Sequence, residues 1–189
     1  LKKSRRGHIG SPLSILEIVR VLYDDILQFD SKQPNWSDRD RFILSKGHGC
    51  LALYLLLADK GFFPDEELYQ FCEFESRLGG HPEYSLPGVE AATGALGHGL
   101  SIGVGIALAA KIDKKQYQTY VVVGDGECQE GAIWEAALSA SKHKLDNLTV
   151  LIDYNKMQCY GPILEVQDLK NLPEKWRSFG FEVRECDGH

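Results

Sequence analysis

Two stretches of the chain carry residues that could hold a metal ion together with a phosphate group. One apolar run ends at Gly124-Asp125-Gly126, and a second apolar run ends at Asp153-Tyr154-Asn155. In a parallel sheet both ends would lie at the carboxyl edge, where loops collect ligands. The carboxylate of Asp125 and the amide oxygen of Asn155 are hard oxygen donors, which Mg²⁺ or Ca²⁺ prefers. We therefore interpret these stretches as a site where a divalent ion bridges a diphosphate to the protein.

The residues around Asp125 suit a phosphate for two further reasons. Glycine at positions 124 and 126 lets the backbone approach a ligand closely. The helix expected after Gly131 would direct its amino end, which favours anions, at the same place. A strand followed by Gly-Asp-Gly is also a common plain turn, so the tripeptide by itself leaves both interpretations open.

Composition excludes several classes of function. The chain has 189 residues, 43% of them apolar and 25% charged, which is enough to bury one sizeable core. A net charge of −6 without a basic stripe argues against nucleic acid as a partner. The longest apolar run, 51–58, is too short to span a bilayer, so we expect no membrane partner. The five cysteines lack CxxC spacing, which favours a reducing, cytoplasmic setting over zinc or disulfides.

Strand-like runs alternate with helical patterns along the whole chain. This alternation predicts an α/β fold, a doubly wound and mainly parallel sheet with helices on both faces. We expect one domain over 1–189, truncated at both ends. The expected strands are 41–45, 120–123, 148–152 and 181–186. The expected helices begin at Pro12, with Ser11 as the N-cap, and elsewhere span 50–60, 65–75, 102–112, 132–144 and 169–178.

Six segments resemble, in the same order, segments of the transketolase family. They are Gly7-His8-Ile9-Gly10-Ser11, Ser45-Lys46-Gly47-His48-Gly49, Gly80-His81-Pro82-Glu83, the Thr-Gly-Ala-Leu-Gly-His-Gly-Leu-Ser run at 93–101, the Gly-Asp-Gly-Glu-Cys-Gln-Glu-Gly run at 124–131, and Asp153-Tyr154-Asn155. The resemblance covers nearly the whole chain as that family's thiamine-diphosphate-binding (PP) domain, like the N-terminal subunit of split transketolases.

The resemblance implies thiamine diphosphate and Mg²⁺ (or Ca²⁺) as cofactors and assigns a role to each matching residue. The implied metal ligands are Asp125, Asn155 and the Met157 carbonyl. The implied cofactor contacts are His48, Gly126 and Asn155 at the diphosphate, with Gly94 and Leu96 along the aminopyrimidine. The implied catalytic residues are His8 and His81 in the substrate channel, with Glu130 and Glu135 as coupled carboxylates at a subunit interface. Compensation of a helix dipole is an alternative role for the two glutamates.

The implied reaction is transfer of a two-carbon ketol unit from a ketose (phosphate) to an aldose (phosphate). Two departures from the family pattern bear on it. The glutamate that activates the aminopyrimidine belongs to the family's pyrimidine-binding (Pyr) domain, which has no counterpart here, and Glu127 is expected at the wrong end of the cofactor to replace it. His98 stands where many transketolases have glutamine. We therefore expect half of an active site, completed by a Pyr-domain subunit or a C-terminal half in a homodimer or heterotetramer.

Two alternatives remain at this point. One is a related thiamine enzyme of the deoxyxylulose-phosphate synthase or dihydroxyacetone synthase type. The Cys-Gln-Glu-Gly continuation and His81-Pro82-Glu83 favour transketolase over it. The other is a catalytically silent homologue that acts as an assembly partner, against which the intact histidines and metal-site residues argue.

Overall fold

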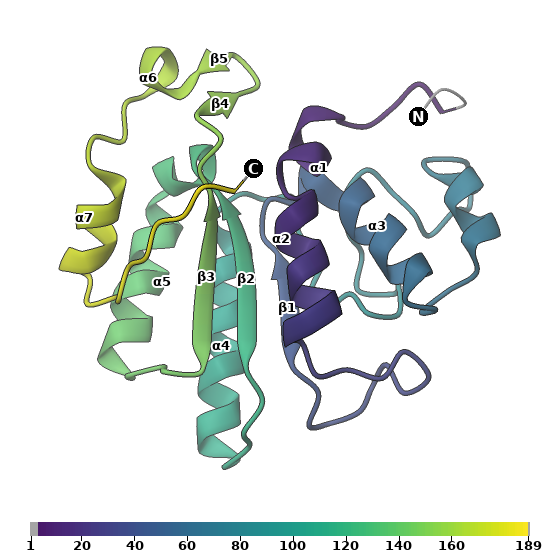
Figure 1. Cartoon of the computed structure of the whole chain (residues 1–189), viewed down its shortest axis with the longest axis horizontal. Helices are drawn as coiled ribbons and strands as arrows, with labels where there is room; N and C mark the ends of the chain where they lie inside the picture. Colours follow the sequence, from purple (N-terminus) through teal and green to yellow (C-terminus); the bar gives the residue numbers. More distant parts are fainter. Residues whose placement is uncertain (1–3, 189) are drawn as a thin grey trace.

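A three-stranded parallel sheet with helices on both faces forms the centre of the computed structural model, which describes residues 4–188 (Figure 1). The strands are β1 (Arg41–Leu44), β2 (Thr119–Gly124) and β3 (Leu148–Asp153), in the spatial order β1-β2-β3. In the register, Val122 lies between Leu44 and Leu151. Because the strands are parallel, their carboxyl ends meet at one edge of the sheet. The expected α/β fold class is confirmed.

The helices and turns follow the strands in the order that the sequence predicts. They are α1 (Gly10–Ser14), α2 (Leu16–Val21), the π-helical turn η1 (Leu22–Ile26), the 3₁₀ turn η2 (Gly47–Gly49), α3 (Cys50–Asp59), the 3₁₀ helix η3 (Asp65–Gln70), α4 (His98–Ile112), the 3₁₀ turn η4 (Gly126–Gln129), α5 (Gly131–Lys142), α6 (Ile163–Val166) and α7 (Leu172–Ser178). A short antiparallel hairpin of β4 (Met157–Gln158) and β5 (Gly161–Pro162) follows β3. Among residues 4–188, we find no helix with both the length and the apolar character needed to cross a membrane.

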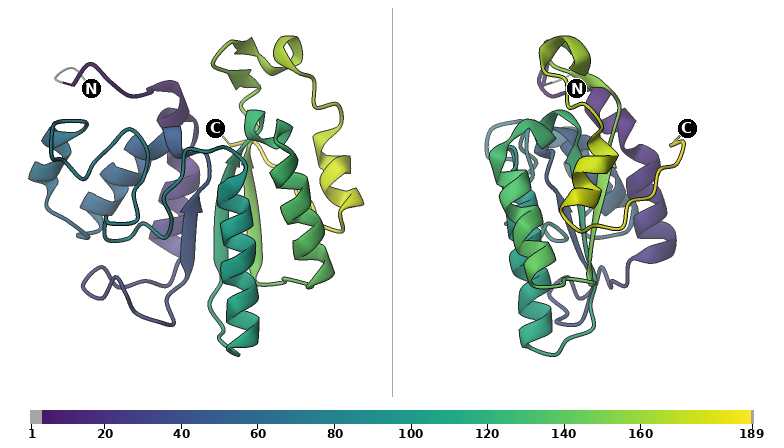
Figure 2. Two further views of the ribbon diagram at one scale, coloured as in Figure 1. Left: turned by 180° about the vertical axis from the view of Figure 1, so that it is seen from behind. Right: turned by 90° about the vertical axis from the view of Figure 1, so that its left-hand side faces the viewer.

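The two faces of the sheet belong to two separate apolar cores. Leu44 and Val122 join the core beneath α2 and α3, whereas Val121 and Val123 join the core beneath α4 and α5. Figure 2 shows α4 and α5 on one side of the sheet and α2 on the other. Strands that are buried on both faces read as continuous apolar runs rather than alternating ones. The central strand β2 is buried along almost its whole length, and this is why it was recognisable from the sequence.

The first predicted helix is broken and begins earlier than expected. Ser11 lies inside α1 and not at its N-cap, a position taken by Ile9, which has no capping side chain. The chain leaves helical geometry at Ile15, with φ −115° and ψ 4°, and resumes as α2. The break lets the Ile15 side chain pack closely against Gly49. A Cβ added to Gly49 would lie only 2.9 Å from Cδ1 of Ile15.

The predicted strand 181–186 is wrong, because this segment forms no strand ladder although it runs alongside β3 (Figure 1). Its apolar side chains serve side-chain packing instead. Phe181 lies edge-to-face on Trp176 at 5.0 Å between ring centroids, and Val183 packs against the core beneath α4 and α5.

Two predicted helices are shorter than expected for local reasons. The helix expected over 65–75 is only the 3₁₀ helix η3, because the chain becomes extended at Phe71 (φ −50°, ψ 123°) and then takes positive φ angles of 56° and 61° at Cys72 and Glu75. The helix expected from 169 begins as α7, because the Asn171 side chain accepts a hydrogen bond from the Glu174 N–H at 3.1 Å and caps it.

Small residues allow α4 to pack directly against the strands. A Cβ on Gly103 would lie 2.5 Å from Cγ2 of Val121, and one on Gly99 would lie 2.6 Å from Cα of Ser45. Gly105, on the opposite side of the helix, has no heavy atom within 4 Å of such a Cβ. The glycine-rich pattern of this helix therefore reflects close packing on the sheet.

We expect the substitution Gly103→Ala to lower the free energy of unfolding by about 1–3 kcal/mol, because it overfills the contact with Val121. The matched control Gly105→Ala should raise it by roughly 0.5–1 kcal/mol through helix propensity alone. Urea denaturation of the two variants measures both effects. Equal effects at the two positions would contradict this packing argument.

Candidate cofactor and metal site

Asp125 is a buried carboxylate at the carboxyl end of β2. Its side chain is 2% exposed, and it accepts hydrogen bonds from the backbone N–H groups of Gly126 and Lys156, both at 2.7 Å. Burial raises the pKa of Asp125 above its usual value, and these two hydrogen bonds act in the opposite direction. In the described part of the chain no lysine or arginine forms an ion pair with it. A desolvated carboxylate of this kind gains from a cation.

The loop after β3 brings Asn155 and Met157 to the same place, because Lys156 between them donates to Asp125. The Asn155 amide is held in one orientation. Its Nδ2 donates to Ser14 Oγ at 3.0 Å and to Asp153 Oδ2 at 3.1 Å, and its Oδ1 accepts from the Met157 N–H at 2.9 Å. The donor set thus fits a hard cation such as Mg²⁺.

Acidic and histidine side chains alone would not be enough to bind a metal ion here. Among residues 4–188 there is no group of three or more histidine, cysteine, aspartate or glutamate side chains that could hold a metal ion. A cation here would rely on the Asn155 amide and on main-chain oxygen beside Asp125.

A buried ion pair that the sequence analysis missed lies beside these residues. Lys46, which is 2% exposed, pairs with the Asp153 carboxylate, and Ser14 Oγ donates to Asp153 Oδ1 at 2.7 Å. These contacts join α1, the end of β1 and the end of β3. The signal was present in the sequence, since Lys46 and Asp153 each stand at the end of an apolar run and two positions before a predicted site residue, His48 and Asn155 respectively.

Glu127 lies beneath the edge of the site rather than in an open channel. It is 2% exposed and accepts hydrogen bonds from Ser45 Oγ, from the Gly97 N–H at 2.8 Å and from the Gly124 N–H at 3.2 Å. Burial raises its pKa, and hydrogen bonds from the same three residues act in the opposite direction. The sequence analysis gave Glu127 no role, whereas here it joins three loops.

The three predicted histidines gather above this edge. The rings of His8 and His48 lie edge-to-face with 5.5 Å between centroids. The ring of His81 lies against Gly94, where an added Cβ would be 2.9 Å from Cδ2 of His81. Burial lowers the pKa of His48 to about 4, with further contributions from the charge of Lys46 and from His8 and His81. His48 is therefore neutral at physiological pH.

The remaining predicted residues occupy different surroundings. Leu96 is half-buried in the loop before α4, and its carbonyl lies 3.2 Å from Nδ1 of the exposed His98. Glu130 lies just before the first turn of α5 and contacts Gly97: a Cβ added to Gly97 would lie 2.9 Å from the Cβ of Glu130. Glu135 is exposed further along α5. Among residues 4–188, no hydrogen bond joins the side chains of Glu130 and Glu135.

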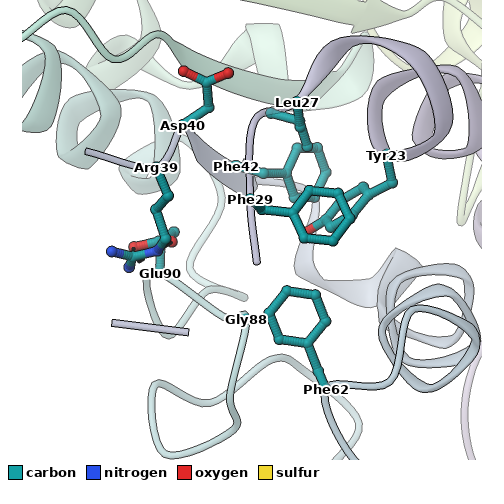
Figure 3. A pocket seen from close by; sticks show the side chains of 9 residues that line it. All are labelled: Tyr23, Leu27, Phe29, Arg39, Asp40, Phe42, Phe62, Gly88 and Glu90. Carbon is teal, nitrogen blue, oxygen red and sulfur yellow. Dashed lines mark hydrogen bonds and ion pairs between the residues drawn. The ribbon is translucent and has the colours of Figure 1, made fainter. Parts of the chain in front are cut away.

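A small hollow elsewhere in the chain is a gap in side-chain packing rather than a candidate ligand site. It lies at the amino end of β1, with a volume of about 20 Å³, which is room for a single water molecule (Figure 3). Tyr23, Phe29 and Phe62 line it, and Arg39 pairs with Glu90 at its rim at 2.8 Å. Because ligands of parallel sheets bind at the carboxyl edge, this end of β1 is the wrong one.

Comparison with known proteins agrees with the geometry of the edge. Residues 1–189 match the family described as transketolase, thiamine diphosphate binding domain. The chain is 48% identical over 186 residues to one subunit of the apulose-4-phosphate transketolase of Phocaeicola vulgatus, covering 98% of this chain and 66% of that protein. It is 45% identical to the 6-deoxy-6-sulfo-D-fructose transketolase subunit SqwG of a Clostridium species, covering 97% and 67%.

A solved structure shows the same fold. The chain superimposes on the crystal structure of transketolase from Campylobacter jejuni with a TM-score of 0.94 and 37% identity, covering 100% of this chain and 31% of that one. The fold and site thus define a thiamine-diphosphate-binding α/β domain. The chain belongs to the transketolase family, as its thiamine diphosphate binding domain. It spans about two thirds of the subunit-sized relatives and under one third of the full-length transketolase.

We expect the His48 imidazole to titrate with a midpoint near pH 4, because burial and Lys46 disfavour its protonated form. The unfolded chain takes up this proton near pH 6.5, so the contribution of His48 to stability is complete above that pH and is lost as the pH falls toward 4. NMR titration of the ring, assigned with a His48→Gln variant, measures the midpoint. A midpoint at or above 6.5 would contradict this electrostatic picture.

Proposed function

We propose that this chain is the cofactor-binding half of a transketolase-type enzyme, which transfers a two-carbon ketol unit from a ketose (phosphate) to an aldose (phosphate). The observation that carries the proposal is the meeting of buried Asp125, oriented Asn155 and neutral His48 at one edge of the sheet. These are the residue types that a metal-bound diphosphate requires.

The residues of the site divide the work as follows. Asp125, Asn155 and the Met157 carbonyl would hold Mg²⁺ (or Ca²⁺), while His48, Gly126 and Asn155 would bind the diphosphate. Gly94 and Leu96 would lie along the aminopyrimidine. Thiamine diphosphate, when bound, supplies the electron sink for cleavage of the carbon–carbon bond.

His8 and His81 would exchange protons with the hydroxyl groups of the sugar, since both are exposed imidazoles beside the cofactor residues. Glu130 and Glu135 would act at a subunit interface. The interface role of Glu130 is supported by its position before α5 and by its contact with Gly97. The interface role of Glu135 is supported only by the exposure of its side chain.

The partner is a Pyr-domain subunit or the C-terminal half of the same enzyme, in a homodimer or a heterotetramer. Two relatives are named as transketolase subunits, which supports a second chain, and their names point to sugar or sugar-phosphate substrates. All five cysteines are free thiols, which suits a reducing compartment, and the cytoplasm is our proposed location.

We expect Asp125→Asn to weaken Mg²⁺-dependent binding of thiamine diphosphate by roughly 100-fold or more, because the variant keeps the shape of the side chain and loses the charge that offsets the metal ion. The matched control is Asp146→Asn, whose carboxylate is 87% exposed on the surface. Titration calorimetry with and without Mg²⁺ compares the two. Unchanged affinity in Asp125→Asn would refute the metal assignment.

We expect the purified chain to show no ketol transfer by itself, even with saturating cofactor and Mg²⁺. The buried carboxylates near the cofactor residues are already engaged, Glu127 with three donors and Asp153 with Lys46. None is free to serve the aminopyrimidine. Activity should appear when a Pyr-domain subunit is added, measured with a ketose phosphate donor and an aldose phosphate acceptor.

The outcomes of this mixing experiment separate three possibilities. Turnover by a confirmed monomer would contradict the composite site. A complex that binds cofactor and never turns over would indicate a catalytically silent assembly partner. Turnover only in the complex is the expected result.

A further inference from the structure

The segment that carries His81 forms neither a helix nor a strand, yet its main-chain carbonyls are held by hydrogen bonds along the segment. Five consecutive carbonyl oxygens, those of residues 78–82, each accept a hydrogen bond. The donors are the Cys72 N–H to Leu78 at 2.8 Å, the Tyr54 hydroxyl near Gly79 at 3.1 Å, Cys50 Sγ to Gly80 at 3.2 Å, the Tyr54 hydroxyl to His81 at 2.8 Å and the Thr93 N–H to Pro82 at 3.2 Å. A loop held at this density has little freedom to move.

Two of these donors are side chains of one helix. Cys50 and Tyr54 are four residues apart in α3, so they lie on the same face one turn apart. Both side chains are 1% exposed and belong to the apolar core on the α2 and α3 side of the sheet. The Tyr54 hydroxyl has one proton, which it shares between two carbonyls, with the shorter contact to His81.

The Tyr54 hydroxyl is a permanent donor. Burial, reinforced by the neighbouring Cys50, raises the pKa of Tyr54 far above its usual value, so the group stays protonated at any working pH. The protonated hydroxyl is therefore available as a hydrogen-bond donor to the loop.

The ring of His81 is restricted from its other side as well. It is exposed, and it lies against the backbone of Gly94, whose φ of 140° and lack of a side chain leave the space that the ring occupies. The main chain at His81 is thus held by Tyr54, and the backbone of Gly94 limits the ring on one side.

We infer that Tyr54 is a positioning residue for His81: its hydroxyl fixes the main chain at His81 and thereby sets where the imidazole meets the substrate. The inference rests on the proposed role of His81 toward the sugar. Tyr54 itself is buried and does not reach the substrate, so it acts through the main chain of the segment that carries His81.

The test compares Tyr54→Phe with the matched control Tyr23→Phe in the chain assembled with its partner. Tyr23 is a buried tyrosine of the same apolar core, and its ring packs edge-to-face on Phe42 and Phe29. We expect Tyr54→Phe to lower kcat for the donor ketose on the order of tenfold, through loss of the hydroxyl that the Gly79 and His81 carbonyls share. Its affinity for thiamine diphosphate should not change, and Tyr23→Phe should leave kcat unchanged.

A double-mutant cycle distinguishes positioning from a general loss of stability. In a His81→Ala background, Tyr54→Phe should cause little further loss of kcat, because the side chain that it positions is gone. Multiplicative losses in the double variant would overturn the inference.

A readout independent of activity is the NMR signal of the His81 ring, assigned by its absence in His81→Ala. This signal should move in Tyr54→Phe and stay in Tyr23→Phe, whereas an unmoved signal in Tyr54→Phe would overturn the inference. If the signal moves while His81→Ala retains full turnover, the positioning stands and the substrate role of His81 fails. Should Tyr54→Phe not fold, Tyr54→Met, which also lacks the hydroxyl, should move the same signal, and an unmoved signal there would overturn the inference equally.

Discussion

The arrangement of the whole edge depends on the hydrogen bonds of one buried carboxylate, that of Glu127. Its three donors come from three segments, after β1, before α4 and at the end of β2. Each donor is adjacent or close to a proposed cofactor residue: Ser45 precedes His48, Gly97 follows Leu96, and Gly124 precedes Asp125. A buried carboxylate with unmade hydrogen bonds is costly, so the three loops are stable together and not separately.

The buried groups at this edge of the sheet carry an excess of negative charge. Among residues 4–188, three buried carboxylates, those of Asp125, Glu127 and Asp153, lie near one buried ammonium group, that of Lys46, which pairs with Asp153. The remaining excess is negative, and burial raises the pKa of both Asp125 and Glu127. A divalent cation would relieve this excess, whereas a further anion alone would increase it.

The sequence predicted the features that side-chain burial determines. The apolar runs ending at Leu44, Val123 and Ile152 located the three strands, and hence the edge where Asp125 and Asn155 meet. It did not predict long-range partners, such as Ser14 with Asp153, because periodicity says which side chains are buried and not what they contact. The same limit explains segment 181–186, whose apolar pattern is real although its backbone pairs with no strand. The β4–β5 hairpin was missed because two-residue strands carry no period.

Helix α3 has a mechanical consequence for the two histidines near its amino end. His48 lies in the turn that leads directly into the helix, and the loop of His81 is hydrogen-bonded to Cys50 and Tyr54 in its first two turns. Both imidazoles are therefore attached to the same helix. A displacement of α3 as a whole would carry the two rings together, so the distance between the proposed diphosphate-binding group, His48, and the proposed sugar-binding group, His81, would change little even while the helix itself moves.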